Sequence, residues 1–178
     1  MSQYAEQLES IVESPRSRAV EVDWDSVESS LVVSLSGDYK EFVEVYGPGE
    51  SDNFIAVMDR RPVDGVSGIL EIWREEIYSF SSLKDVVPFP SWVSNPEDVL
   101  SPRAETSNDD TYFCQMTPSN DSDLWNVVLC DDELDGRYYF PGKMTHFLVS
   151  AQSGDIDSDF FVNLSPLGES CFVPGGAG

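Results

Sequence analysis

The only histidine, His146, is the first residue to consider for catalysis at neutral pH, because an unperturbed imidazole titrates close to that pH. It lies in a helical pattern beside Phe147 and Leu148, and no serine or cysteine motif accompanies it. A histidine-dependent triad would rest on this residue alone, and a multi-histidine metal site is excluded. The sequence therefore favours a structural or surface role for His146, and we expect no enzymatic activity.

Carboxylates could also bind a cation, and the stretch DIDSDF, which starts at Asp155, begins like a calcium-binding loop. An EF-hand needs glycine at its sixth position and glutamate at its twelfth. Here these positions hold Phe160 and Pro166, which excludes an EF-hand and leaves only a loose cation site as an alternative. Many acidic pairs approach glycosidase spacing by chance in so acidic a chain, so such pairs predict no reaction.

The three cysteines are odd in number, widely spaced and without a CxxC pair. They therefore predict neither a disulfide framework nor a zinc site. Cys114, Cys130 and Cys171 stand in apolar runs and are interpreted as small core residues rather than reactive thiols. We expect no cofactor and no metal, and a reducing cytoplasm as the compartment.

Acidic residues are concentrated between Ala104 and Gly136, a window that contains no Lys or Arg. They are Glu105, Asp109, Asp110, Asp121, Asp123, Asp131, Asp132, Glu133 and Asp135. The apolar runs of this window fit strands, so its acids should collect in the turns TPSNDSD and DDELDG and in the preceding segment AETSNDD. One interpretation is a solvated acidic face. The other is a patch that contacts a cationic protein surface, and we predict acidic partner contacts from these segments.

Affinity would also require aromatic anchors at the centre of such an interface. The candidates are Trp92, Trp125, Tyr138 and Tyr139, with Trp125 placed in the predicted interaction site. Packing in the core is the alternative for each of them, because aromatic side chains commonly fill sheet and helix faces.

Composition restricts the class of protein. The chain of 178 residues carries 33 acidic and 10 basic residues, a formal net charge of -23, yet 40% of it is hydrophobic. A single folded domain is expected, with no direct binding to nucleic acid and no attraction to anionic membranes. The N-terminus lacks the basic and apolar regions of a targeting signal, and no apolar run approaches the roughly 20 residues that span a bilayer.

The elements that would position these residues alternate between helical and strand patterns. The stretch GDYKEFVEVYGPG predicts a helix that Asp38 could cap and that ends at Gly47, with one apolar stripe of Tyr39, Phe42, Val43 and Tyr46. Further helices are expected over 2–12, 24–31, 68–80 and 142–154. The last of these should bury Met144, Phe147, Leu148 and Ala151 and stop at Gly154.

Strands are expected over 53–59, 111–116, 124–130 and 137–140, and the last three should form an antiparallel meander because short polar turns separate them. Residues 86–102 are rich in proline and serine and predict an irregular connection. The residues after 155 look like a C-terminal extension, with a frayed end at PGGAG.

The order of three motifs resembles the SUKH superfamily, which includes cell-wall-assembly regulators and bacterial toxin-immunity proteins. The motifs are LVVSLSGDYKEFVEVYGPG, TYFCQMTPSNDSDLWNVVLCD and FPGKMTHFLVSAQSGD. The resemblance covers roughly residues 20–155, so residues 1–155 are assigned to one SUKH-like domain and 156–178 to the extension. It implies an α+β fold, with a mainly antiparallel sheet packed against helices.

For function, the resemblance implies protein binding without catalysis. The leading hypothesis is an immunity protein that binds and neutralises a cognate bacterial toxin, a basic nuclease being the class that acidity suits best. The alternatives are a regulatory scaffold for endogenous proteins and an acidic mimic of nucleic acid.

Overall fold

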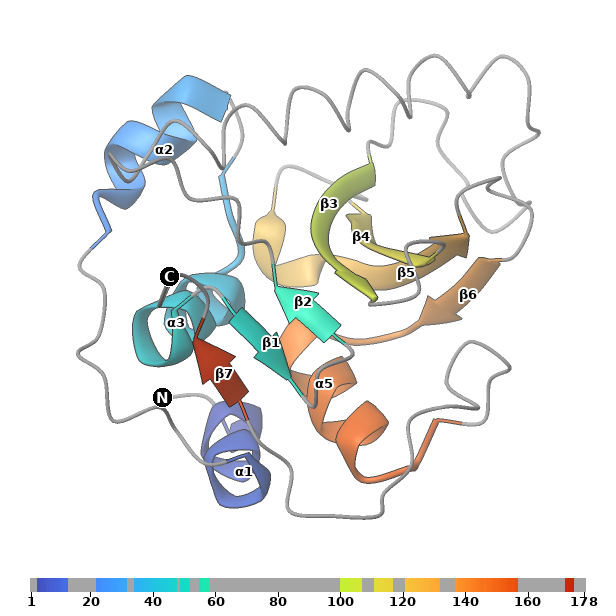
Figure 1. Cartoon of the computed structure of the whole chain (residues 1–178). Helices are drawn as coiled ribbons and strands as arrows, with labels where there is room; N and C mark the ends of the chain where they lie inside the picture. Colours follow the sequence, from blue (N-terminus) through green and yellow to red (C-terminus); the bar gives the residue numbers. More distant parts are fainter. Residues whose placement is uncertain are drawn as a thin grey trace.

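The computed structural model describes residues 3–12, 22–31, 34–47, 49–51, 55–57, 100–106, 111–116, 121–131, 137–156 and 172–174 (Figure 1). The helices are α1 (Gln3–Ile11), α2 (Trp24–Leu31), α3 (Gly37–Tyr46), the short 3₁₀ helix η1 (Ser122–Leu124) and α5 (Met144–Gln152). The strands are β1 (Gly49–Ser51), β2 (Ile55–Val57), β3 (Leu100–Thr106), β4 (Thr111–Met116), β5 (Asn126–Asp131), β6 (Arg137–Phe140) and β7 (Phe172–Pro174).

The strands form one seven-stranded sheet in the order β6-β5-β4-β3-β2-β1-β7. Every neighbouring pair is antiparallel. Strands β4, β5 and β6 follow one another both in the sequence and in the sheet, so the predicted meander is confirmed. The fold is therefore α+β with an antiparallel sheet, as the sequence predicted.

Helices α1, α2, α3 and α5 share one hydrophobic core with the sheet, and α2 contributes Val27 to it. Leu8 of α1, Phe42 of α3 and Phe147 of α5 are each at most 3% exposed and belong to the same buried cluster. Ile55 of β2 and Leu129 of β5, which are both fully buried, supply the sheet side of that cluster. Burying these large apolar side chains is the main force that holds the helices on the sheet.

Helix α3 follows the predicted pattern closely. All four members of its apolar stripe, Tyr39, Phe42, Val43 and Tyr46, are buried. The helix ends where Gly47 adopts a φ of 70° and donates its N–H to the carbonyl of Val43 at 2.9 Å. A positive φ is accessible to glycine without a steric penalty, which explains why the helix stops at this residue.

Helix α5 also buries the four predicted residues, Met144, Phe147, Leu148 and Ala151. Its end is fixed by Gly154, which has a φ of 72° and donates its N–H to the carbonyl of Ala151 at 3.2 Å. The N–H of Asp155 reaches the carbonyl of Ser150 at 2.9 Å, which completes a Schellman motif. The predicted stop at Gly154 is confirmed.

The predicted irregular connection over 86–102 is wrong at its end, because Leu100–Pro102 belong to β3. This strand pairs with β2 on one side and with β4 on the other, and its register shifts between Pro102 and Ala104. Proline has no N–H for a sheet ladder, and a local irregularity accommodates it. The backbone pairing of two neighbours therefore overrides a composition that is typical of a loop.

The residues after 155 are not all an extension outside the sheet. Phe172–Pro174 form β7, which pairs with β1 at one sheet edge, and Phe172 is 7% exposed within the core. The sequence assignment missed this strand because it is short and stands next to a glycine-rich end. The helix predicted over 68–80 lies outside the described residues.

Candidate functional site

The structure describes four of the nine residues that the sequence placed in one interaction site. Asp121 and Asp123 are exposed, and Trp125 is buried. Asp131 is the last residue of β5, opposite Thr111 of β4, so it is a strand residue rather than part of a turn. The remaining predicted contacts, Asp109, Asp110, Asp132, Glu133 and Asp135, lie outside the described residues. Of the segment AETSNDD, Ala104–Thr106 belong to β3 rather than to a turn.

Trp125 cannot serve as the exposed aromatic anchor that the sequence analysis expected, because it is 3% exposed. It stands between η1 and β5 and donates its backbone N–H to the carbonyl of Ser122 at 3.3 Å. Its large ring is thus part of the protein interior, which is the alternative that aromatic residues usually follow. The predicted role in direct partner contact is wrong for this residue.

Several hydrogen bonds hold the turn from Asp121 to Trp125, which is called the η1 turn below. A carboxylate oxygen of Asp121 accepts the backbone N–H of Asp123 at 3.1 Å and so caps η1. The hydroxyl of Ser122 donates to the carbonyl of Leu35 at 3.2 Å, which ties the turn to the segment before α3. Leu124 is 60% exposed at the tip of this turn. The exposure of Leu124 could not be predicted from the sequence, because the apolar run LWNVVLC predicted a strand that starts at this residue.

Asp123 forms an ion pair that the acidic window did not suggest. The ammonium group of Lys143 donates to its Oδ1 at 2.9 Å. The hydrogen bond from Lys143, the positive charge of that lysine and the N–H of Gly37 lower the pKa of Asp123, although partial burial opposes them. A base from outside the window therefore neutralises one of its acids.

Asp38 caps a different helix from the one that the sequence predicted. It is the second residue of α3 and is only 4% exposed. Its Oδ2 accepts the backbone N–H of Thr145 at 3.1 Å and the hydroxyl of the same residue at 3.4 Å. The N-cap residue of α5 is Lys143, whose side chain contains no acceptor. The carboxylate of Asp38, which belongs to α3, thus accepts a hydrogen bond from a backbone N–H in the first turn of α5 that has no partner within its own helix.

The second described lysine is paired as well. The ammonium group of Lys40 lies 2.5 Å from a carboxylate oxygen of Glu28, and that oxygen also accepts the N–H of Leu35 at 2.6 Å. Burial would raise the pKa of Glu28, but the hydrogen bonds from Lys40 and Leu35 and the charge of Lys40 together lower it. Both lysines whose side chains the structure describes therefore have a carboxylate partner.

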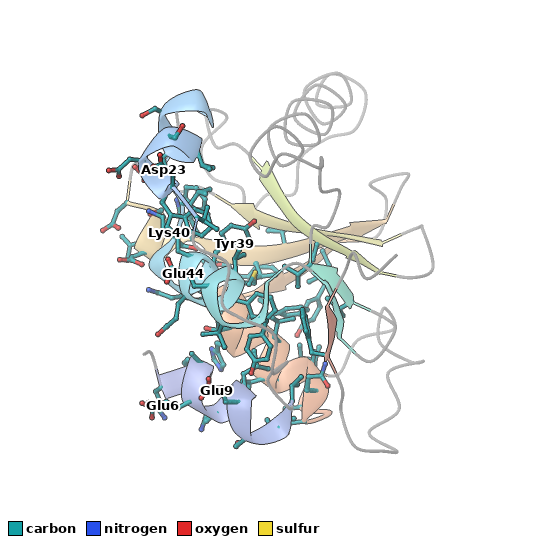
Figure 2. The ribbon with its side chains drawn as sticks, turned by 60° about the vertical axis from the view of Figure 1, so that its left-hand side comes forward. Glu6, Glu9, Asp23, Tyr39, Lys40 and Glu44 are labelled. Carbon is teal, nitrogen blue, oxygen red and sulfur yellow. The ribbon has the colours of Figure 1, made fainter. Side chains whose placement is uncertain are left out.

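Other acidic side chains collect on the outer faces of the first three helices (Figure 2). The exposed ones are Glu6, Glu9, Asp23, Asp25 and Glu44. Figure 2 shows Glu6 and Glu9 on α1, Glu44 on α3 and Asp23 at the start of α2 along one side of the molecule. Glu44 accepts the indole N–H of Trp24 at 2.7 Å, which joins α2 to α3. The sequence could have predicted this acidic face, because acidic residues stand opposite the apolar stripes of the helices.

His146 is half-buried between two aromatic rings. Its ring stacks on Tyr4 of α1 with the centroids 4.0 Å apart, and the edge contact with Phe140 has a centroid distance of 4.9 Å. Burial lowers the pKa of His146 below its usual 6.5. The imidazole thus joins α1 to α5, which agrees with the structural role that the sequence favoured.

No group of three or more His, Cys, Asp or Glu side chains in the described part of the chain is arranged to hold a metal ion. Within the same residues, no helix combines the length and the apolar character needed to cross a bilayer.

Comparison with known proteins gave no relative. Neither the family models nor the curated proteins nor the solved structures contained a match to this chain.

Proposed function

We propose that this protein is a non-enzymatic immunity protein that binds and neutralises a cognate bacterial toxin in the cytoplasm. The favoured toxin is a basic nuclease. Nuclease active sites must attract phosphate, so they present cationic surfaces that an acidic protein can approach rapidly and cover.

The arrangement of charge carries this proposal. The two lysines with described side chains are both paired with a carboxylate, Lys40 with Glu28 and Lys143 with Asp123. Glu6, Glu9, Asp23, Asp25, Glu44 and Asp121 meanwhile face solvent. Among the described side chains, the lysines are thus paired while these acids face solvent, and such a surface selects a cationic partner.

Two further points support the same function. The α+β fold with its antiparallel sheet is compatible with the resemblance to the SUKH superfamily. The contacts of His146 and Asp38, which could otherwise be interpreted as catalytic groups, are explained by packing and by helix capping. The proposal therefore needs no catalytic step.

The direct test uses the toxin gene expected beside the gene of this protein. Co-expression should restore the growth that the toxin alone abolishes, and the two purified proteins should co-elute during gel filtration at low salt. A neighbouring product that is neither toxic nor bound would refute the immunity function.

Further observations separate the two alternative functions from immunity. A regulatory scaffold would instead retain several endogenous proteins, and its gene would lie far from any toxin gene. A mimic of nucleic acid would compete with unrelated DNA-binding proteins, whereas an immunity protein should discriminate among them.

A further inference from the structure

Leu124 is the most exposed large apolar side chain in the part of the chain that the structure describes. It is 60% exposed, and the other exposed large side chain in that part, Tyr139, reaches 36%. A single exposed leucine on a mobile loop would be unremarkable, because apolar groups are common on protein surfaces. The position of Leu124 within the η1 turn distinguishes it.

The η1 turn holds Leu124 in a defined position before any partner binds. On one side, Asp121 accepts the N–H of Asp123, and the hydroxyl of Ser122 donates to the carbonyl of Leu35. On the other side, the buried ring of Trp125 fixes the backbone where β5 begins. A side chain on such a turn loses little conformational freedom on binding, so its contacts contribute more fully to affinity.

The charge around Leu124 defines the chemistry of a matching surface. Asp121 is exposed in the same turn, and Asp123 retains 61% side-chain exposure although it pairs with Lys143. The complementary surface is an apolar pocket with a Lys or Arg beside it. A second copy of this chain is a poor binding partner for the η1 turn, because two chains that each carry a net charge of -23 repel each other.

We infer that Leu124 is the apolar anchor of the interface with the basic toxin and that Asp121 is its charged neighbour. This inference rests on the proposed function and adds the site and the chemistry of the contact. Leu124 inserts into the apolar pocket of the toxin, while Asp121 contacts a cationic group at the pocket rim. Asp121 thereby accelerates association, and Leu124 slows dissociation.

The test measures the binding of the neighbouring toxin, purified as an inactive variant, to the full-length protein by surface plasmon resonance. Leu124→Ala should weaken binding about tenfold or more, mainly through faster dissociation. Asp121→Asn keeps an oxygen that can accept the N–H of Asp123 but removes the charge. It should slow association and reduce the dependence of the association rate on salt.

Gln7→Ala is the control, because it truncates an exposed side chain on α1, outside the η1 turn, and should leave binding within about twofold of the wild type. Thermal unfolding of each variant checks that the fold is intact. If Leu124→Ala binds the toxin as tightly as the wild type does, this inference is overturned and the immunity function still stands. A toxin that does not bind the wild type would overturn both.

Discussion

The Oδ2 atom of Asp38 lies 3.1 Å from the backbone nitrogen of Thr145, so the first turn of α3 caps the first turn of α5. Asp123 of η1 pairs with Lys143 at the start of α5, and the N–H of Gly37 at the start of α3 helps to lower the pKa of that carboxyl. Polar contacts thus join η1, α3 and the start of α5 at a single junction.

Removal of the Asp38 carboxylate should destabilise this junction. Asp38→Ala leaves the buried N–H and hydroxyl of Thr145 without their acceptor, and it should lower the free energy of unfolding by about 1–3 kcal/mol. Asp38→Asn keeps an acceptor oxygen and should cost about half as much. Urea unfolding of both variants measures the difference.

The opposite result, in which Asp38→Asn is not destabilised, would also be informative. No donor among the described residues lies within hydrogen-bond distance of Oδ1 of Asp38, so part of the buried charge is uncompensated. If Asp38→Asn proved as stable as the wild type or more stable, the charge itself would not stabilise the fold, and only the acceptor oxygen would matter.

The ion pair between Asp123 and Lys143 should be weak and sensitive to salt. Both side chains are substantially exposed, so a double-mutant cycle with Asp123→Asn and Lys143→Gln should give a coupling energy of about 0.2–1 kcal/mol. Raising the salt concentration to 1 M should reduce it. Coupling that is unchanged at high salt would contradict the solvent-screened character of this pair.

The sign of the pH dependence follows from the lowered pKa of Asp123. Because the folded state holds the carboxylate ionised more strongly than the unfolded state does, the pair contributes stability above the usual carboxyl pKa of 3.8. This contribution is lost as the pH falls through the lower folded pKa. The coupling energy should therefore be fully present at pH 7 and should decrease as the pH is lowered below 3.8.

His146 should make the fold less stable under mildly acidic conditions. Its folded pKa is below 6.5, so the unfolded chain binds a proton more readily than the folded one. Stability from this residue is complete above pH 6.5 and declines as the pH falls towards the folded pKa. His146→Phe keeps an aromatic ring between Tyr4 and Phe140 but cannot titrate, so it should flatten this part of the melting temperature profile between pH 5 and pH 8.

An independent measurement checks the same residue. His146 is the only histidine, so its imidazole proton resonances can be followed by NMR without an assignment step. The midpoint of that titration should fall below 6.5. A midpoint at or above 6.5 would show that burial does not control the charge of His146.

Gly142→Ala should disturb the aromatic contacts of His146. An added Cβ would lie 2.7 Å from Nδ1 of His146 and 2.7 Å from a ring carbon of Phe140, which forces one of the rings to move. We expect a loss of about 1–3 kcal/mol in the free energy of unfolding, the usual cost of overpacking. Chemical denaturation measures it.

Gly37→Ala is the matched control, because the nearest atom to its added Cβ, Oδ1 of Asp123, is 3.6 Å away in ordinary contact. This substitution should be neutral or slightly stabilising. Equal losses from the two substitutions would indicate a general intolerance of side chains at glycines rather than a steric clash at Gly142.

Local patterns predicted the described α-helices and strands β2, β4, β5 and β6, but they missed β1, β3 and β7, and long-range contacts could not be predicted. The apolar stripes of α3 and α5 were correct because helical periodicity depends only on neighbours three and four residues apart. The Asp38 contact joins residues separated by 107 positions, and the Asp123 ion pair joins residues separated by 20. No local spacing encodes such contacts, so the acidic window looked unpaired and Asp38 looked like the cap of its own helix.

Trp125 and Leu124 show the same limit at the candidate site. Residue type suggests that a tryptophan is the better interface anchor, but the start of β5 directs Trp125 inward and leaves Leu124 outside. The exchange depends on where η1 ends and β5 begins, and boundaries are the least predictable property of a strand.

The position of β7 has a consequence for how the chain folds during synthesis. Among the described strands, β1 has β2 on one side and only β7 on the other, and Glu50 lies opposite Val173. While the ribosome makes the chain, this side of β1 therefore stays open until Phe172–Pro174 emerge. Closing so long a loop is entropically costly and slow, and an open strand edge can pair with other chains. In the interval between synthesis of β1 and of β7, this edge of β1 can therefore pair with other nascent chains.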